Sequence, residues 1–223
     1  MALYPVNLNI VDKLCLVVGG GMVALRKTKS LLACGAKIRV ISPEVHAELK
    51  ALAHNRKIEW FARSFAEGDV QGAFLVFAAT DNPEVQLLIT TEAAKYSVLL
   101  NSIDNPRQSQ FHVPAHFRRG KMLVTVSTGG GSPALAKTIR QRLEHQFAPE
   151  YAVVVELLSL IREKIVGMDT SPEVNSELFR RLLQQGIVEL VLHADWFELQ
   201  MLLLRELPEE ADPVELMQKI VER

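Results

Sequence analysis

Three consecutive glycines near the start of the chain could bring peptide backbone close to a phosphate group. Gly19, Gly20 and Gly21 directly follow the apolar run Leu14–Val18 and directly precede an amphipathic segment. Read as Gly19-x-Gly21-x-x-Ala24, they match the strand–loop–helix turn that binds dinucleotides, in which glycines allow a tight turn and close approach to a pyrophosphate. Phosphate oxygens would then meet unpaired N–H groups at the helix N-terminus. The alternative interpretation is a tight turn without a ligand.

The end of the second apolar run offers side chains for the adenosine end of such a ligand. Residues 37–41 are followed by Ser42, Pro43 and Glu44. In dinucleotide-binding units an acid near this point often holds the adenine ribose, so Ser42 and Glu44 are candidate contacts. The alternative is that Ser42 and Pro43 cap the next helix. Because no acid stands directly at the strand end, these residues leave the choice between NAD and NADP open.

Two further segments place polar residues at the predicted carboxyl edge of the same sheet. Residues 78–81 end the fourth strand, where Thr80 or Asp81 could lie beside a ligand or cap the following helix. The fifth strand brings Asn101 and Asp104 to this edge. A carboxylate at position 104 could accept a proton or orient a substrate. The alternative there is an Asp-Asn-Pro turn.

A second glycine run, Gly129, Gly130 and Gly131, leads into Ser132 and Pro133. Serine suits the N-cap of a helix and proline its first position, so a helix should begin here. Its N-terminus is a second candidate anion site. Basic side chains nearby could hold a carboxylate-rich substrate or could form a solvated basic face; they are Arg118, Arg119, Lys121, Lys137 and Arg140.

The bulk composition is that of an ordinary globular protein. Of the 223 residues, 48% are hydrophobic and 23% are charged. No uncharged apolar run reaches membrane-spanning length and the N-terminus lacks signal-peptide character, so we expect a cytoplasmic protein that does not enter a membrane. We expect Cys15 and Cys34 to be reduced residues of the core. His112, His116 and His145 lack metal-ligand spacing, so we expect no metal site.

The formal net charge of −1 hides a strong asymmetry along the chain. Residues 1–111 carry a net charge of +2, residues 112–147 carry +5, and residues 148–223 carry −8. A basic middle beside an acidic tail suggests an anionic ligand or complementary packing between parts. No nucleic-acid-binding motif accompanies the basic segment, so we expect no nucleic acid partner.

Short apolar runs alternate with helical patterns in the first half of the chain, which predicts a parallel sheet with right-handed crossovers. The predicted strands are 14–18, 37–41, 57–61, 73–78 and 98–102, and the predicted helices are 23–33, 44–54 and 82–95. Residues 110–113 and 122–127 are β-rich, but the loop between them is too short for a helical crossover. Later helices are predicted over 133–145, 151–166, 173–192, 195–204 and 213–221.

These patterns predict an α/β protein: a Rossmann-like parallel sheet domain, a small α+β segment, and a C-terminal all-helical domain. The expected boundaries are 1–112 for the dinucleotide-binding domain, 113–147 for the segment with the second glycine loop, and 148–223 for the helical domain.

Five motifs, in this order, resemble the precorrin-2 dehydrogenase family of siroheme synthesis, some members of which also act as sirohydrochlorin ferrochelatases. The motifs are Val18-Gly-Gly-Gly-Met-Val-Ala-Leu-Arg-Lys27, Ala78-Ala-Thr-Asp81, Asn101-x-x-Asp104-x-Pro106, Phe111-x-x-Pro114 and Gly129-Gly-Gly-Ser-Pro133. Each is weak alone, but the ordered set over residues 5–145 is specific. The helical tail matches only in general character.

The resemblance implies oxidation of precorrin-2 to sirohydrochlorin with NAD+ by a homodimer, with residues 113–147 as the dimerisation segment. It places Asp104 at the family's catalytic aspartate, and Thr128 where some relatives carry a serine near the tetrapyrrole cleft. Together with the glycine motif it gives the expected NAD contacts as Gly19, Gly20, Gly21, Met22, Val23, Ser42, Pro43, Glu44, Thr80 and Asn101. The expected tetrapyrrole contacts are Gly129, Gly130, Gly131, Ser132, Arg118, Arg119 and Lys137.

Three functional alternatives accompany this expectation. Insertion of Fe2+ into sirohydrochlorin is open, because no protein metal-ligand cluster is visible. The same glycine loop could belong to a non-catalytic NAD-sensing module whose acidic tail docks a partner. It could also belong to a dehydrogenase of another anionic small molecule, although the motifs at 101–106 and 129–133 argue against this.

Overall fold

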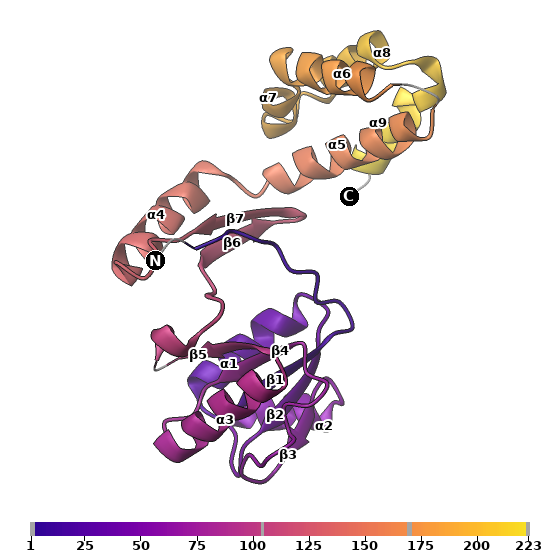
Figure 1. The fold of residues 1–223 in the computed structure, drawn as a ribbon. Coiled ribbons are helices and arrows are strands. Elements are labelled where there is room, and N and C mark those ends of the chain that lie inside the picture. Colours follow the sequence, from indigo (N-terminus) through magenta and orange to yellow (C-terminus); the bar gives the residue numbers. More distant parts are fainter. Residues whose placement is uncertain (1–2, 104, 169–170, 222–223) are drawn as a thin grey trace. The chain divides into compact units, whose positions relative to one another are not determined.

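The computed structural model describes residues 3–103, 105–168 and 171–221, which form two compact units. The first unit is Leu3–Val113 and the second begins at Pro114 (Figure 1). The predicted fold class is confirmed, because a parallel sheet with helices is followed by a hairpin with one helix and then by helices alone. The division at residue 147 and the dimerisation role of residues 113–147 stay predictions.

Five parallel strands form the sheet of the first unit. They are β1 Leu14–Val18, β2 Lys37–Ile41, β3 Glu59–Phe61, β4 Leu75–Ala78 and β5 Leu99–Ser102, in the spatial order β3-β2-β1-β4-β5. The chain therefore moves outward from β1 in one direction and then returns to build β4 and β5 on the other side. This change of direction makes the carboxyl ends of β1 and β4 a topological switch point, where open α/β sheets bind ligands.

Helices cover both faces of this sheet. They are α1 Met22–Leu32, α2 Ala47–His54 and α3 Pro83–Lys95. Because successive strand side chains point to opposite faces, Cys15 and Val17 of β1 pack in a core with residues of α1 and α2, whereas Leu16 and Val18 pack with residues of α3. The central strands are apolar at every position because both of their faces are buried.

The second unit begins with an antiparallel hairpin. Strands β6 Ala115–Arg119 and β7 Met122–Val126 are joined by a tight turn in which Gly120 has a φ of +55°. Helix α4 Pro133–Gln146 packs against both strands. Ser132 is its N-cap, and the Oγ atom accepts a hydrogen bond from the Leu135 N–H, as the sequence predicted.

The prediction of a β-rich run at 110–113 is wrong in position, because the strand begins at Ala115. Residues 110 and 111 are instead held along β5. Gln110 bonds the backbone of Leu100 through both its N–H and its side-chain Oε1, and the Asn101 Nδ2 donates to the carbonyl of Phe111. The true hairpin partner of β7 is the basic segment that the sequence indicated as a loop.

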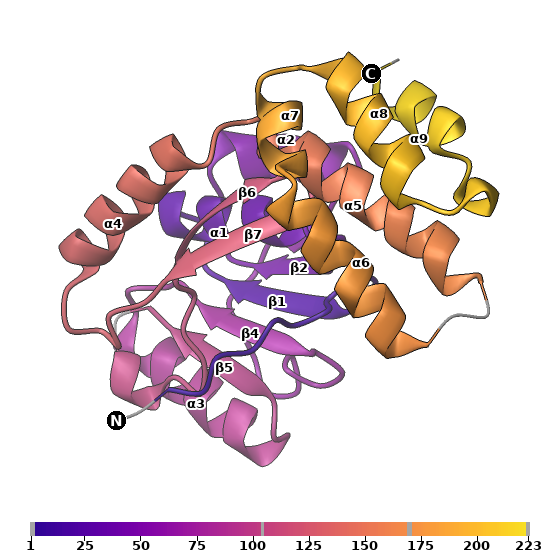
Figure 2. The same cartoon turned by 90° about the horizontal axis from the view of Figure 1, so that it is seen from above.

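Five helices complete the second unit. They are α5 Tyr151–Val166, α6 Pro172–Gln184, α7 Ile187–Leu192, α8 Trp196–Glu206 and α9 Pro213–Val221. Helix α5 contacts α7 and α9, and α8 contacts α7 and α9 (Figure 2). Their shared core is aliphatic and includes the fully buried Leu157, Ile161, Leu182 and Leu203. None of the helices in the described ranges is long and apolar enough to cross a membrane.

The single helix predicted over 173–192 is wrong, because Gly186 divides it into α6 and α7. Its φ of +83° lies in the left-handed region, which a continuous right-handed helix cannot accommodate. The periodicity of apolar residues continues through this break, so the pattern alone did not reveal it.

Candidate functional site

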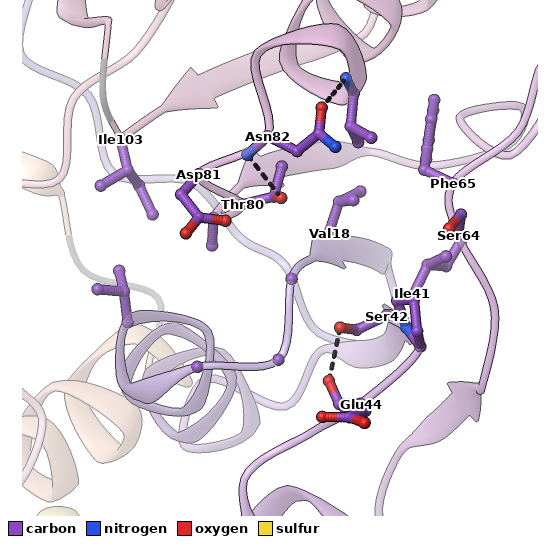
Figure 3. A pocket seen from close by; sticks show the side chains of 17 residues that line it. Val18, Ile41, Ser42, Glu44, Ser64, Phe65, Thr80, Asp81, Asn82 and Ile103 are labelled. Atoms are coloured by element: carbon purple, nitrogen blue, oxygen red, sulfur yellow. Dashed lines mark hydrogen bonds between the residues drawn. The ribbon is translucent and has the colours of Figure 1, made fainter.

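A pocket of about 570 Å³ opens at the switch point of the first unit. The ends of β1, β2 and β4, the glycine loop and the segment after β5 line it (Figure 3). In Figure 3, Thr80 and Asp81 lie on one side of Val18, and Ser42 and Glu44 lie on the other. Three separately predicted segments therefore meet at one cavity.

The first two glycines of the loop are required by close backbone packing. A Cβ on Gly19, whose φ is +122°, would lie 2.2 Å from the carbonyl oxygen of Ala79. One on Gly20 would lie 1.9 Å from the carbonyl oxygen of Glu44. In contrast, a Cβ on Gly21 would meet nothing within 4 Å. The loop is thus wedged between the β4 and β2 ends, and only Gly21 faces open space.

The N-terminus of α1 at this pocket is suited to an anion. Gly21 is the N-cap and contributes no side-chain hydrogen bond, and the first turn of α1 contains no acid. Among the described helices, α3, α4, α6 and α8 are all capped by a side chain. Because the first N–H groups of a helix lack intrahelical partners, the start of α1 presents free donors and a positive dipole end to the pocket.

The wall at the end of β2 is a compact turn. The Ser42 Oγ donates to the Glu44 carbonyl at 2.6 Å, and the Trp60 Nε1 donates to the Ser42 carbonyl at 3.0 Å. The alternative that Ser42 and Pro43 cap the next helix is wrong. The cap of α2 is His46, whose Nδ1 accepts from the Glu48 N–H at 3.2 Å. Ser42, Pro43 and Glu44 instead line the pocket.

The wall at the end of β4 combines small and polar residues. Ala79, Thr80, Asp81 and Asn82 all line the pocket. The cap of α3 is Asn82, whose Oδ1 accepts hydrogen bonds from the N–H groups of Glu84 and Val85. The alternative that Thr80 or Asp81 caps this helix is therefore wrong. The carbonyl of Thr80 accepts a hydrogen bond from the Gln86 side chain, which fixes this edge.

The predicted cofactor contacts divide into two groups. Eight of the ten line the pocket, namely Gly19, Gly20, Gly21, Val23, Ser42, Pro43, Glu44 and Thr80. Met22 begins α1, is 64% exposed and is not among the lining residues. Asn101 does not reach the pocket, because its side chain is buried and donates to the Phe111 carbonyl at 2.9 Å. Asp104 lies outside the described residues.

Sequence reasoning missed several lining residues. Ser64 and Phe65 follow the short strand β3, Val85 lies in the first turn of α3, and Ile103 follows β5. No motif marks Ser64 or Phe65, since the loop after β3 has no characteristic spacing. The position of Ile103 directly beyond β5 was the available signal, because strand ends at this edge meet at the switch point.

The second glycine loop is ordered by the threonine before it. The Ser132 N–H donates to the Thr128 Oγ1 at 3.1 Å, and that hydroxyl donates to the Ser132 carbonyl at 3.1 Å. Gly129 and Gly130 adopt φ values of +61° and +86°. The structure thus gives Thr128 a role in closing this loop, and Gly129, Gly130 and Gly131 remain exposed.

The basic residues near this loop do not form one cluster. Arg119 donates to the carbonyls of Glu144 and Phe147, both at 2.9 Å, and so binds the C-terminal end of α4. Lys121 pairs with Glu156 at 3.2 Å, and Arg140 pairs with Glu144. Arg118 and Lys137 are exposed. Arg119 is therefore engaged in the fold, and its predicted contact with a substrate competes with this role.

We next searched the described residues for side chains that could bind a metal ion. Within the described parts of the chain, no group of three His, Cys, Asp or Glu residues could hold a metal ion. His116 instead contacts the carbonyl of Pro114 at 3.0 Å. Burial raises the pKa of the Cys15 thiol to about 11, with a further contribution from Cys34, so Cys15 is a protonated core residue.

The sheet order, the glycine loop and the uncapped start of α1 together define a Rossmann-like protein of the dinucleotide-binding class. Residues 6–115 match a family model described as putative NAD(P)-binding, and residues 119–146 match one described as sirohaem biosynthesis protein central. Both matches confirm the resemblance to siroheme biosynthesis proteins that the motifs carry.

Relatives with similar sequences are siroheme synthases, in agreement with the two family models. Siroheme synthase 3 of Aeromonas hydrophila is 36% identical over 82% of this chain and 39% of its own length. The siroheme synthase of Nitrosomonas europaea is 36% identical over 86% of the chain and 40% of its own length. The chain thus spans about two fifths of these relatives. The solved structure of SirC, precorrin-2 dehydrogenase, has a TM-score of 0.74 at 24% identity and covers 97% of this chain and all of its own, which supports the fold.

Proposed function

We propose that this chain oxidises precorrin-2 to sirohydrochlorin, with NAD+ as the hydride acceptor. The reaction removes two hydrogens from the tetrapyrrole, one as a hydride that converts NAD+ to NADH and one as a proton that leaves to a base. The observation that carries the proposal is the uncapped N-terminus of α1 behind Gly21, at the switch-point pocket of a chain that resembles siroheme synthases.

Each part of the pocket has a role in this proposal. The backbone N–H groups at Gly21, Met22 and Val23 bind the pyrophosphate at the start of α1. Ser42, Pro43 and Glu44 form the adenosine side, and the Glu44 carboxylate would repel a 2′-phosphate, which favours NAD over NADP. Thr80 forms the opposite wall. The bound dinucleotide supplies the hydride acceptor.

Proton removal is assigned to Asp104. The motif match to the family's catalytic aspartate and the position of this residue two places beyond Ser102, the last residue of β5, support the assignment. A carboxylate at the same sheet edge as the glycine loop can accept a proton from a pyrrole ring as the hydride leaves.

An anaerobic assay tests the proposal. Fresh precorrin-2 and NAD+ should yield NADH and sirohydrochlorin in equal amounts, followed by their absorbance. Asp104→Asn should abolish turnover while the affinity for NAD+ persists. Full activity of this variant would exclude Asp104 as the base. Binding of NAD+ by the wild-type chain without any turnover would instead favour the non-catalytic NAD-sensing module.

The remaining family expectations rest on the relatives and the motifs. Iron insertion is tested by adding Fe2+ to the product of the first assay and following siroheme formation. The homodimer, with residues 113–147 at its interface, is tested by light scattering of the purified chain. The cytoplasmic location stays a prediction and is tested by cell fractionation.

A further inference from the structure

A half-buried lysine on α1 has no role in the pocket described above. The Lys27 Nζ lies 5.5 Å from the centroid of the Phe77 ring, over its face. Phe77 in turn packs edge to face on Phe111 at 5.3 Å between centroids. The register of β4 and β5 places Phe77 opposite Asn101, which bonds the Phe111 carbonyl. We call Lys27, Phe77, Asn101 and Phe111 the Lys27 cluster.

The ammonium group in this cluster lacks an anionic partner among the described residues. Two other lysines of this unit show the usual arrangement, since Lys29 pairs with Glu48 at 2.5 Å and Lys37 pairs with Asp12 at 3.4 Å. Lys27 forms no such pair within residues 3–103, 105–168 and 171–221, and its cation–π contact satisfies none of its three N–H donors. Burial lowers the pKa of Lys27 from its ordinary value, and the charge of Arg26 lowers this pKa further.

A cation that is partly removed from water and left unpaired is costly to the fold. Methionine or leucine would cover Phe77 at least as well without that cost. The arrangement therefore suggests a ligand that supplies the missing negative charge.

The position of Lys27 separates it from the expected pyrophosphate site. Lys27 follows Gly21 by six residues, so its Cα lies about 9 Å further along the axis of α1. It is four residues after Val23, which lines the pocket, and so lies on the same edge of the helix. That edge faces Phe77 of β4, whereas the edge bearing Lys29 faces Glu48 of α2.

We infer that Lys27 binds a carboxylate of the tetrapyrrole substrate, so that the Lys27 cluster forms a substrate subsite between the nucleotide pocket and β5. The inference rests on the proposed function, because it takes the substrate to be a polycarboxylate. The ammonium donates hydrogen bonds to a carboxylate side chain at the rim of the macrocycle. The apolar faces of Phe77 and Phe111 exclude water around this ion pair and strengthen it.

Matched variants of two lysines on the same helix test this inference. Lys27→Met retains the apolar stem and removes the charge, Lys27→Arg retains the charge, and Lys29→Met removes an exposed charge two residues further along α1. We expect Lys27→Met to weaken sirohydrochlorin binding about tenfold. The affinity for NAD+ should stay within about twofold of wild type. Lys27→Arg should recover most of the loss, and Lys29→Met should bind as wild type.

Salt dependence separates this role from a structural one. An ion pair makes binding weaker as salt rises, so the affinity of Lys27→Met for sirohydrochlorin should depend less steeply on salt than that of the wild-type chain. Unchanged tetrapyrrole affinity in Lys27→Met would overturn the inference. A loss of NAD+ affinity equal to the loss of tetrapyrrole affinity would also overturn it, because Lys27 would then lie at the pyrophosphate. An unchanged salt dependence of tetrapyrrole binding, together with a lowered unfolding temperature, would overturn it as well and would indicate that Lys27 only packs in the fold.

The outcome also distinguishes this inference from the proposed function. If the wild-type chain binds sirohydrochlorin and oxidises precorrin-2 while Lys27→Met does both equally well, only the subsite is wrong. If the wild-type chain does neither, the proposed function fails and the subsite fails with it.

Discussion

Gly20 and Glu44 are in direct backbone contact: a Cβ on Gly20 would lie 1.9 Å from the Glu44 carbonyl oxygen and 2.8 Å from the Cα of Val45. The His46 N–H also donates to the Gly20 carbonyl at 2.8 Å. The middle glycine of the loop is thus fixed by the segment that follows β2, whereas Gly19 packs against Ala79 after β4.

This contact predicts opposite behaviour for two adjacent glycines. Gly20→Ala should destabilise the protein by about 1–3 kcal/mol, because backbone must move to admit the methyl group. Gly21→Ala should change the free energy of unfolding by less than about 0.5 kcal/mol, since its Cβ meets open space. Gly21→Ala should also weaken NAD+ binding about tenfold, because the methyl group occupies the space in which the pyrophosphate binds. Denaturant unfolding and NAD+ titration measure both effects, and equal stability of the two variants would contradict the prediction.

Substitutions of Arg119 and Lys137 should affect stability differently, although the sequence predicted that both residues contact the substrate. Arg119→Met should lower stability by about 1–2 kcal/mol, because two charge-assisted hydrogen bonds to the end of α4 are lost. Lys137→Met should leave stability within about 0.5 kcal/mol, since Lys137 is exposed on α4. If Lys137 contacts the tetrapyrrole as predicted, the affinity for sirohydrochlorin falls in this variant alone. A fully stable Arg119→Met protein would show that the contacts at the end of α4 are dispensable.

The helical part of the second unit should lose stability at acidic pH through Glu215. Hydrogen bonds from Lys164 and Lys219 lower the pKa of Glu215 from 4.5 to about 2. A carboxyl whose pKa is lower in the folded state stabilises the protein above its unfolded pKa and loses this contribution as the pH falls toward its folded pKa. The stability difference between wild type and Glu215→Gln should thus be constant from pH 7 to about 5.5 and should shrink between pH 4.5 and about 2.

Unfolding by urea at a series of pH values measures this difference. The control variant is Glu177→Gln, which removes the ion pair of Glu177 with Arg180 on α6. This pair is more exposed than that of Glu215, so water screens it more strongly and its stability difference should depend less on pH. A stability difference for Glu215→Gln that does not depend on pH would contradict the assigned cause of the pKa shift.

Much of the fold follows from local patterns. The bounds of β1, β2, α5 and α9 agree with the sequence prediction because each is an apolar pattern that ends at glycine, proline or a polar cluster. The break at Gly186 was not predictable in this way, since it depends on a backbone conformation and leaves the apolar periodicity intact. The hairpin strand at 115–119 was missed because its basic residues hide the alternation that marks a strand.

The site was predicted less completely than the fold. The glycine motif identified Gly19 and Gly21, but treated Gly20 as variable, although the nearest obstacle to a side chain there is Glu44, twenty-four residues away. Likewise, the engagement of Arg119 depends on carbonyls at residues 144 and 147. Contacts of this kind join residues far apart in sequence, so neither spacing nor composition reveals them.

The uncapped start of α1 has a consequence for how the protein responds to its ligand. Helices such as α3 and α4 carry their own terminal hydrogen-bond acceptors in Asn82 and Ser132. Helix α1 would receive its acceptor only from a bound phosphate, so the dinucleotide itself would complete the helix. Amide hydrogen exchange at Met22, Val23 and Ala24 should then slow when NAD+ binds, while exchange at the start of α3 stays unchanged. The first turn of α1 would thereby serve as a built-in reporter of nucleotide occupancy.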